Sequence, residues 1–162
     1  MNPRPAENAT ADNFRQASAT ALRLLARREH SEQELRYKLR SRGYAECLVE
    51  NVLSSLREEG ALSDCRYTES YVLTRYEHGF GPLRIVAELR ERGVSPVLID
   101  DVLASPGFDW EQSAWRQRLK RFGSGVPQDF SERARQMRFL QQRGFDNEQI
   151  RAALADETEA AG

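Results

Sequence analysis

Basic side chains set four residues apart are the part of this sequence most suited to chemistry. Examples are Arg23–Arg27, Arg36–Arg40 and Arg116–Lys120. On a helix, side chains four positions apart lie on the same face. The planar guanidinium group binds carboxylates and phosphates through two parallel hydrogen bonds. These pairs therefore predict surfaces that bind an acidic protein or a nucleic acid.

The full set of candidate partner-binding residues adds neighbours of these pairs and two arginines from the middle of the chain. It comprises Arg23, Arg27, Arg28, Arg36, Arg40, Arg84, Arg92, Trp115, Arg116, Lys120 and Arg121. Trp115 belongs to it because it stands beside Arg116 and off the helical line of Trp110, which predicts exposure. The alternative for any single arginine is a solvated helix face. Arg92 has a further alternative, because a base in the last turn of a helix interacts favourably with the helix dipole.

The remaining reactive side chains predict no catalytic or metal site. His30 and His78 are isolated and lack neighbours at the spacing of metal ligands. The glycines stand where helices should end and do not form a phosphate-binding loop motif. The carboxylates are scattered over predicted helix faces and suggest no acid–base pair. We therefore predict a binding protein that is not an enzyme and needs no cofactor.

Charge is segregated along the chain although the formal net charge is only −1. Residues 23–42 hold seven basic and three acidic side chains, and residues 111–144 hold eight basic and three acidic ones. Proteins that bind duplex DNA as their main task need many phosphate contacts. The nearly equal numbers of basic and acidic side chains in the whole chain favour an acidic protein as the partner, or a surface composed of protein and nucleic acid. Direct DNA binding is expected to be weak at most.

The elements that position these residues come from three near-copies of one helical phrase. The copies lie at residues 39–44, 89–94 and 140–145, and their glycines are 50 and 51 positions apart. The shared positions are a leucine (Leu39, Leu89, Leu140) and, four residues on, a glycine (Gly43, Gly93, Gly144). Self-similarity at a fixed period indicates a tandem array of one supersecondary unit. Such arrays usually form extended binding surfaces.

Local signals predict that each unit contains three helices. Ser31 and Glu34 have the spacing of a capping box, in which the serine caps the helix and the carboxylate reaches back. Asp64, Ser95 and Asp109 mark further helix starts, and Pro82 fits the first turn of another helix. No segment alternates with the period of a strand. The prediction is an all-α fold of three tandem three-helix repeats, roughly nine helices, in an elongated and curved molecule.

The predicted boundaries divide the chain into five segments. These are a disordered N-terminus at 1–12, repeats at 13–60, 61–107 and 108–155, and a flexible acidic tail at 156–162. No stretch has the apolar length of a membrane span or of a signal peptide. We therefore predict a cytoplasmic protein without a membrane partner. A monomer is expected, because no long apolar stripe is left over for a second copy.

Three motifs resemble those of the RecX family of recombination regulators, over roughly residues 17–154. The first is Arg28-Glu29-His30-Ser31-Glu32-Gln33-Glu34-Leu35-Arg36 with Lys38-Leu39. The second is Gly81-Pro82-Leu83-Arg84-Ile85 with Glu88-Leu89 and Arg92-Gly93-Val94, and the third is Phe130-Ser131 with Arg138-Phe139-Leu140 and Arg143-Gly144-Phe145. Together and in this order they are specific, and the resemblance implies the same three-repeat fold.

The resemblance also implies a function. Members of the family bind the RecA recombinase filament on single-stranded DNA and restrain its growth. They thereby reduce ATP hydrolysis, strand exchange and the co-protease activity that triggers the SOS response in DNA repair and homologous recombination. Two other hypotheses stay open. One is a helix-turn-helix-like module that competes directly for single-stranded DNA, and the other is a helical scaffold for an unrelated protein.

Overall fold

The structure is a computed structural model that describes residues 5–155, with side-chain burial given from residue 10 onward. Within those residues it contains nine α-helices and no strand, so the all-α prediction is confirmed. In chain order they are α1 (Pro5–Leu25), α2 (Glu32–Arg40), α3 (Glu46–Glu58), α4 (Asp64–Glu77), α5 (Pro82–Glu91), α6 (Pro96–Leu103), α7 (Trp110–Phe122), α8 (Phe130–Arg143) and α9 (Asn147–Leu154). None of them is long and apolar enough to cross a membrane.

The N-terminal segment differs from the prediction. Residues 1–12 were expected to be disordered, but α1 already begins at Pro5. Proline is favoured in the first turn of a helix, and the alanine-rich stretch that follows has high helix propensity. These local preferences outweigh the lack of an apolar stripe. Residues 1–4 and the predicted tail at 156–162 lie outside the described part of the chain.

Most predicted helix starts are confirmed, with two corrections of detail. The side chains of Ser31, Ser95 and Asp109 each accept a hydrogen bond from the backbone N–H three residues on. Glu34, however, does not reach back to complete a capping box, because its carboxylate accepts a hydrogen bond from Arg28 instead. Asp64 does not cap its own helix, because its Oδ1 accepts from the backbone nitrogen of Glu32 at 2.7 Å.

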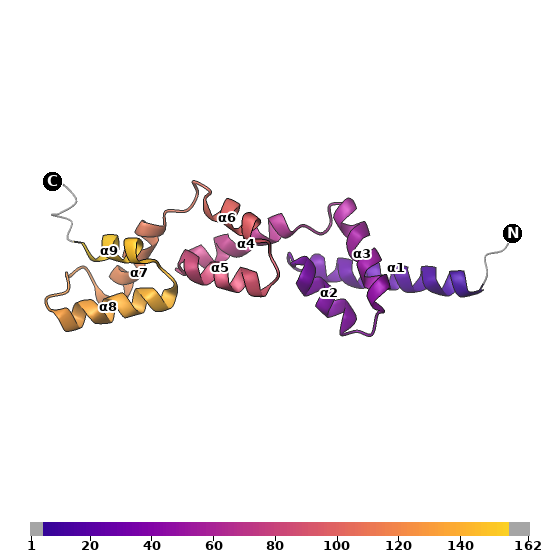
Figure 1. Cartoon of the computed structure of the whole chain (residues 1–162), viewed down its shortest axis with the longest axis horizontal. Coiled ribbons are helices and arrows are strands. Elements are labelled where there is room, and N and C mark those ends of the chain that lie inside the picture. Colours follow the sequence, from indigo (N-terminus) through magenta and orange to yellow (C-terminus); the bar gives the residue numbers. More distant parts are fainter. Residues whose placement is uncertain (1–4, 156–162) are drawn as a thin grey trace. The chain divides into compact units, whose positions relative to one another are not determined.

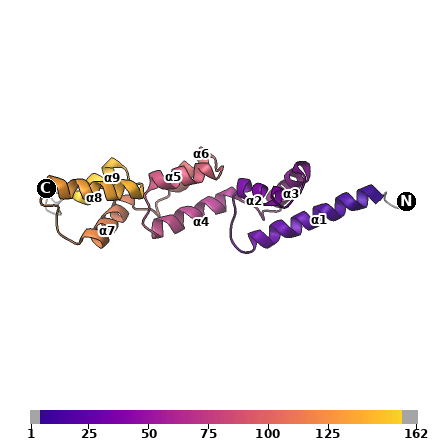
Figure 2. The same cartoon turned by 90° about the horizontal axis from the view of Figure 1, so that it is seen from below.

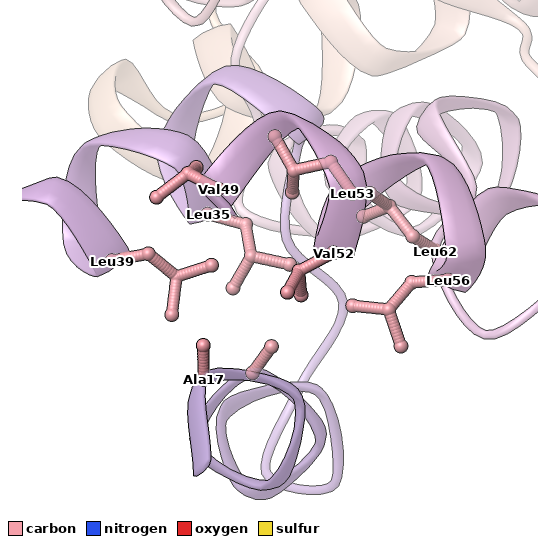
Figure 3. Packing of buried hydrophobic residues seen from close by; sticks show 9 residues of the cluster. Ala17, Leu35, Leu39, Val49, Val52, Leu53, Leu56 and Leu62 are labelled. Carbon is pink, nitrogen blue, oxygen red and sulfur yellow. The ribbon is translucent and has the colours of Figure 1, made fainter. Parts of the chain in front are cut away.

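The helices divide into two compact units. Unit 1 holds α1, α2, α3, the part of α4 up to Ser70, and the turn Arg92–Val94. Its core forms where α2 and α3 pack on α1 (Figure 2). Figure 3 shows leucine and valine side chains of α2 and α3 directed toward Ala17 of α1. The buried residues of this core are Ala17, Ala21, Leu35, Leu39, Val49, Val52, Leu53, Leu56 and Leu62.

Unit 2 holds Tyr71–Glu91 and, within the described part of the chain, residues 95–155. Its C-terminal core lies among α7, α8 and α9, which pack against one another (Figure 1). The buried residues there are Ala114, Leu140, Phe145, Ile150, Ala153 and Leu154. In the same unit α5 contacts α6, and Ile85, Leu89 and Ile99 are fully buried. The repeat boundaries at 13–60, 61–107 and 108–155 stay predictions.

A repeated contact connects the glycine turns to earlier helices. In unit 1, the Ser31 hydroxyl at the start of α2 donates a hydrogen bond to the carbonyl oxygen of Arg92 at 3.0 Å. In unit 2, the backbone nitrogen of Gly81 before α5 donates to the carbonyl oxygen of Arg143 at 2.8 Å. The start of one repeat's second helix thus contacts the end of the corresponding helix in the next repeat. The turn after α2 lacks this contact, and a Cβ added to Gly43 would meet nothing within 4 Å.

Candidate functional site

Three arginines of unit 1 surround one shallow hollow of about 320 Å³ between the end of α1 and the turn after α2. Its lining consists of Thr20, Arg23, Leu24, Arg27 and Arg42. Arg23 and Arg27 are the first of the predicted pairs, and both line this hollow, Arg23 from the last turn of α1 and Arg27 from the turn that follows the helix. Arg42 joins them because α2 ends at Arg40, which leaves Arg42 in the turn that follows.

Hydrogen bonds to backbone carbonyl groups orient two of the three arginines of the hollow, but no described carboxylate neutralises their charge. The Arg23 Nε donates to the carbonyl oxygen of Ala19 at 3.2 Å, and the Arg42 Nη1 donates to that of Lys38 at 2.7 Å. The side chain of Arg27 has no hydrogen-bond or ion-pair partner among the described residues. None of the three forms an ion pair with a described carboxylate. The hollow therefore keeps its positive charge and can bind a carboxylate or a phosphate.

The other candidates of unit 1 form ion pairs within the unit. Arg28 pairs with Glu34, and this hydrogen bond raises the pKa of Arg28. Arg36 Nε donates to Glu50 at 2.6 Å and its Nη2 donates to Glu32 at 2.8 Å. Arg40 pairs with Glu46 at 3.2 Å. A partner that used these arginines would have to displace carboxylates that already hold them.

The two central candidates also have partners. The Arg84 Nε donates to Glu88 at 3.0 Å, and the guanidinium group lies 4.5 Å from the ring centroid of Phe80. The side chain of Arg92 is half-buried, and its carbonyl oxygen receives the hydrogen bond from Ser31. The structure places Arg84 in unit 2 and Arg92 in unit 1.

The candidates on α7 have different environments. Arg116 donates to the side chain of Gln112 one turn earlier. Lys120 and Arg121 are exposed and have no side-chain partner among the described residues. Trp115 was expected to be exposed, but it is half-buried and packs against the core of unit 2. The expectation was wrong because α7 packs against both α8 and α9, so partial burial extends beyond the line of Trp110 and Ala114.

One buried cation of α7, Arg118, was missing from the predicted site residues. It lies between Arg116, which has a side-chain partner, and Arg121, which has none among the described residues. Arg118 is only 4% exposed, and its Nε donates to Gln136 Oε1 at 3.0 Å. Its Nη2 donates to the carbonyl oxygen of Gly125 at 2.6 Å. Arg118 thus fixes the loop between α7 and α8. Its four-residue spacing from Ala114 on the buried face was the available signal.

The described residues offer no metal site, since no group of three or more His, Cys, Asp or Glu side chains there could hold an ion. Cys47 and Cys65 are both exposed free thiols. The best-defined candidate site is the basic hollow, which can bind a carboxylate or a phosphate.

Comparison with protein families gives three matches in chain order. They are to the first, second and third three-helix domains of RecX, at residues 17–56, 63–103 and 107–154. A regulatory protein RecX from Halorhodospira halophila is 50% identical over 144 residues, which cover 88% of this chain and 89% of that one. Regulatory protein RecX from Pseudomonas savastanoi pv. phaseolicola is 43% identical over 136 residues, covering 84% and 88%.

Solved structures agree with the fold. A crystal structure of regulatory protein RecX aligns with a TM-score of 0.79 and 26% identity, covering 93% of this chain and 77% of that one. The crystal structure of RecX from Lactobacillus salivarius aligns with a TM-score of 0.75 and 21% identity, covering 88% and 95%. The prediction of three consecutive three-helix domains is confirmed.

Proposed function

The chain belongs to the RecX family of regulatory proteins, and from this premise we propose that it binds the RecA filament on single-stranded DNA. Binding restrains filament growth and lowers ATP hydrolysis, strand exchange and co-protease activity. The protein thereby modulates recombination, repair and the SOS response in the cytoplasm. It acts by binding and does not catalyse a reaction. The observation that carries the proposal is the match to all three family domains in order.

The basic hollow supplies the physical means for such binding. Arg23, Arg27 and Arg42 offer guanidinium groups that no described carboxylate neutralises. On a nucleoprotein filament they can meet acidic side chains of the recombinase or phosphates of the DNA. Contacts of this kind speed association and set specificity, and they weaken as salt rises.

The test is the DNA-dependent ATP hydrolysis of RecA on preformed single-stranded DNA filaments, titrated with this protein. We expect hydrolysis to fall while the protein is still far below one molecule per RecA protomer. An effect that begins only when enough protein is present to coat the DNA would favour the second candidate, direct competition for single-stranded DNA. That candidate is supported by the same three arginines, since they suit phosphates as well as carboxylates. No effect at any ratio would contradict both.

Reversing charge in the hollow tests the contact surface. We expect the pair Arg23→Glu and Arg27→Glu to raise the half-inhibitory concentration by about tenfold, because repulsion replaces two attractive contacts. Arg28 is left unchanged because its ion pair with Glu34 belongs to the start of α2. The control is Arg15→Glu, which changes an exposed arginine of the same helix away from the hollow. Inhibition that survives the paired change, at unaltered helical content, would exclude these positions as the contact.

A further inference from the structure

The outward face of α8 carries an apolar groove that is separate from the basic hollow of unit 1. The groove encloses about 430 Å³ and is lined by Phe130, Arg133, Ala134, Met137, Arg138 and Gln141. These positions recur at helical spacing and so share one face. The side chain of Phe130 is 87% exposed, whereas Met137 is half-buried and packs against the core of unit 2. An aromatic side chain this exposed beside an apolar groove marks a surface that gains free energy when it is covered.

The charges at the groove are unpaired. The side chains of Arg133 and Arg138 have no hydrogen-bond or ion-pair partner among the residues that the structure describes. Other arginines nearby are occupied. Arg118 is bound to Gln136, Arg135 lies 5.2 Å from the ring centroid of Phe122, and Arg143 Nη1 donates to the carbonyl oxygen of His78 at 3.0 Å. Two free guanidinium groups beside an apolar groove favour an occupant with carboxylates at its edges.

We propose that this groove binds an amphipathic helical segment of a protein. Apolar side chains of the segment enter the groove beside Phe130 and Met137, and acidic side chains on its flanks pair with Arg133 and Arg138. A helix laid into an apolar groove is a recurrent mode of recognition, with anchors spaced three and four residues apart. The inference rests on the proposed function, since the segment would belong to a RecA protomer, and it adds a contact surface on unit 2.

Two other occupants fit the groove less well. Single-stranded DNA would stack its bases on aromatic rings, but Phe130 is the one aromatic side chain in the lining, and Ala134 and Met137 offer none. A second copy of this chain, bound groove to groove, would bring two pairs of free arginines together. Like charges placed opposite each other oppose association. An acidic protein segment satisfies both the apolar lining and the charge.

Photo-crosslinking from the groove identifies the occupant directly. The substitution Phe130→p-benzoylphenylalanine is made in the full-length protein, which is then irradiated on preformed RecA filaments on single-stranded DNA. We expect an adduct with RecA that maps to a peptide with apolar residues at helical spacing between Asp or Glu side chains. An adduct with the DNA, an adduct with a second copy of the chain, or no adduct on filaments that are inhibited would overturn the proposal.

Substitutions in the groove give a second readout on the same filaments. We expect Phe130→Ser to raise the half-inhibitory concentration by about 30-fold, as the loss of a central anchor typically does. Separately, Arg133→Glu with Arg138→Glu should raise it by about tenfold, because repulsion replaces two attractive contacts. The controls are Val97→Ser on α6, 70% exposed, and Arg151→Glu on α9, which also lie in unit 2 but outside the groove. Unchanged inhibition in both groove variants would overturn the groove assignment alone. A wild-type protein that fails to inhibit would overturn the proposed function and, with it, this assignment.

Discussion

His30 is buried at the turn before α2, within reach of three charged residues. Its Nδ1 lies 3.0 Å from the carbonyl oxygen of Arg28, and its Nε2 lies 2.9 Å from Lys38 Nζ. The ammonium group of Lys38 can only donate, so Nε2 accepts and the proton of the neutral ring sits on Nδ1. Glu34 Oε1 is 3.9 Å from the ring. Burial lowers the pKa of His30 more than its hydrogen bond to Arg28 and the charge of Glu34 raise it.

This environment predicts a stability that falls in mild acid. The folded state disfavours the charged ring, so the unfolded chain binds more protons once the pH drops below about 6.5. The contribution of neutral His30 to the free energy of unfolding is therefore complete above that pH. It declines as the pH falls toward the lowered pKa of His30 in the folded state. The carboxyl group of Glu34 titrates well below this pH range. Burial raises its pKa, but the hydrogen bonds from Arg28 and Lys38 outweigh burial and lower the pKa to about 2.

The measurement compares urea denaturation of the wild type and of His30→Gln between pH 7.5 and 5.5, a range chosen to bracket the ordinary histidine pKa of about 6.5. The wild type should lose stability on acidification, and the variant should lose less because it lacks the titrating ring. Equal pH dependence in the two proteins would show that His30 is not the group responsible. His78 serves as the matched control, since His78→Gln removes an exposed histidine of unit 2.

At the residue scale, the spacing of the arginines in the sequence predicted which of them share a face, but it did not predict which side chains they contact. Arg23 and Arg27 were predicted to share a face and do line one hollow. Arg36 was predicted on the same grounds, yet it pairs with Glu50, fourteen residues further along the chain. Arg118 falls within the same basic stretch as Arg116 and is nevertheless buried. Apart from the spacing of Arg118 from Ala114, no local signal distinguishes these outcomes, because each depends on which helix packs alongside.

At the element scale, the three repeated glycines serve two purposes. Gly43, Gly93 and Gly144 all adopt positive φ, at 86°, 73° and 92°. This backbone conformation favours glycine and lets the chain leave a helix. Gly144 has a second role, because a Cβ there would lie 2.6 Å from the backbone nitrogen of Arg84. Close approach of two backbones is therefore required in unit 2 but not at the turn after α2.

Alanine substitutions separate these two purposes. We expect Gly43→Ala to destabilise the protein by about 1 kcal/mol, from the positive φ alone. Gly144→Ala should cost about 3 kcal/mol, because the added methyl group also forces α5 away from the turn. The check is the midpoint of chemical unfolding for each variant, followed by helical circular dichroism. Equal losses for the two variants would show that the contact with Arg84 contributes nothing.

At the scale of the whole molecule, the repeat pattern predicts an elongated and curved chain, since thin three-helix units in a row share no single thick core. A compact domain of this length would have a radius of gyration of about 15 Å. We expect small-angle X-ray scattering of the monomer to give a clearly larger value and a skewed distance distribution. A value near that of a compact sphere would contradict the prediction. Static light scattering on the same sample tests the expected monomer.

The sequence by itself determined the helices, their glycine ends and the threefold repetition. Those features depend on capping side chains, apolar spacing and backbone preferences that act within a few residues. The tertiary structure decided which arginines stay free, which are paired and which is buried. It also decided that Ser31 contacts Arg92, sixty-one positions away, and that Gly144 packs against α5. Such contacts are absent from local sequence patterns because they form only when distant segments share the same space.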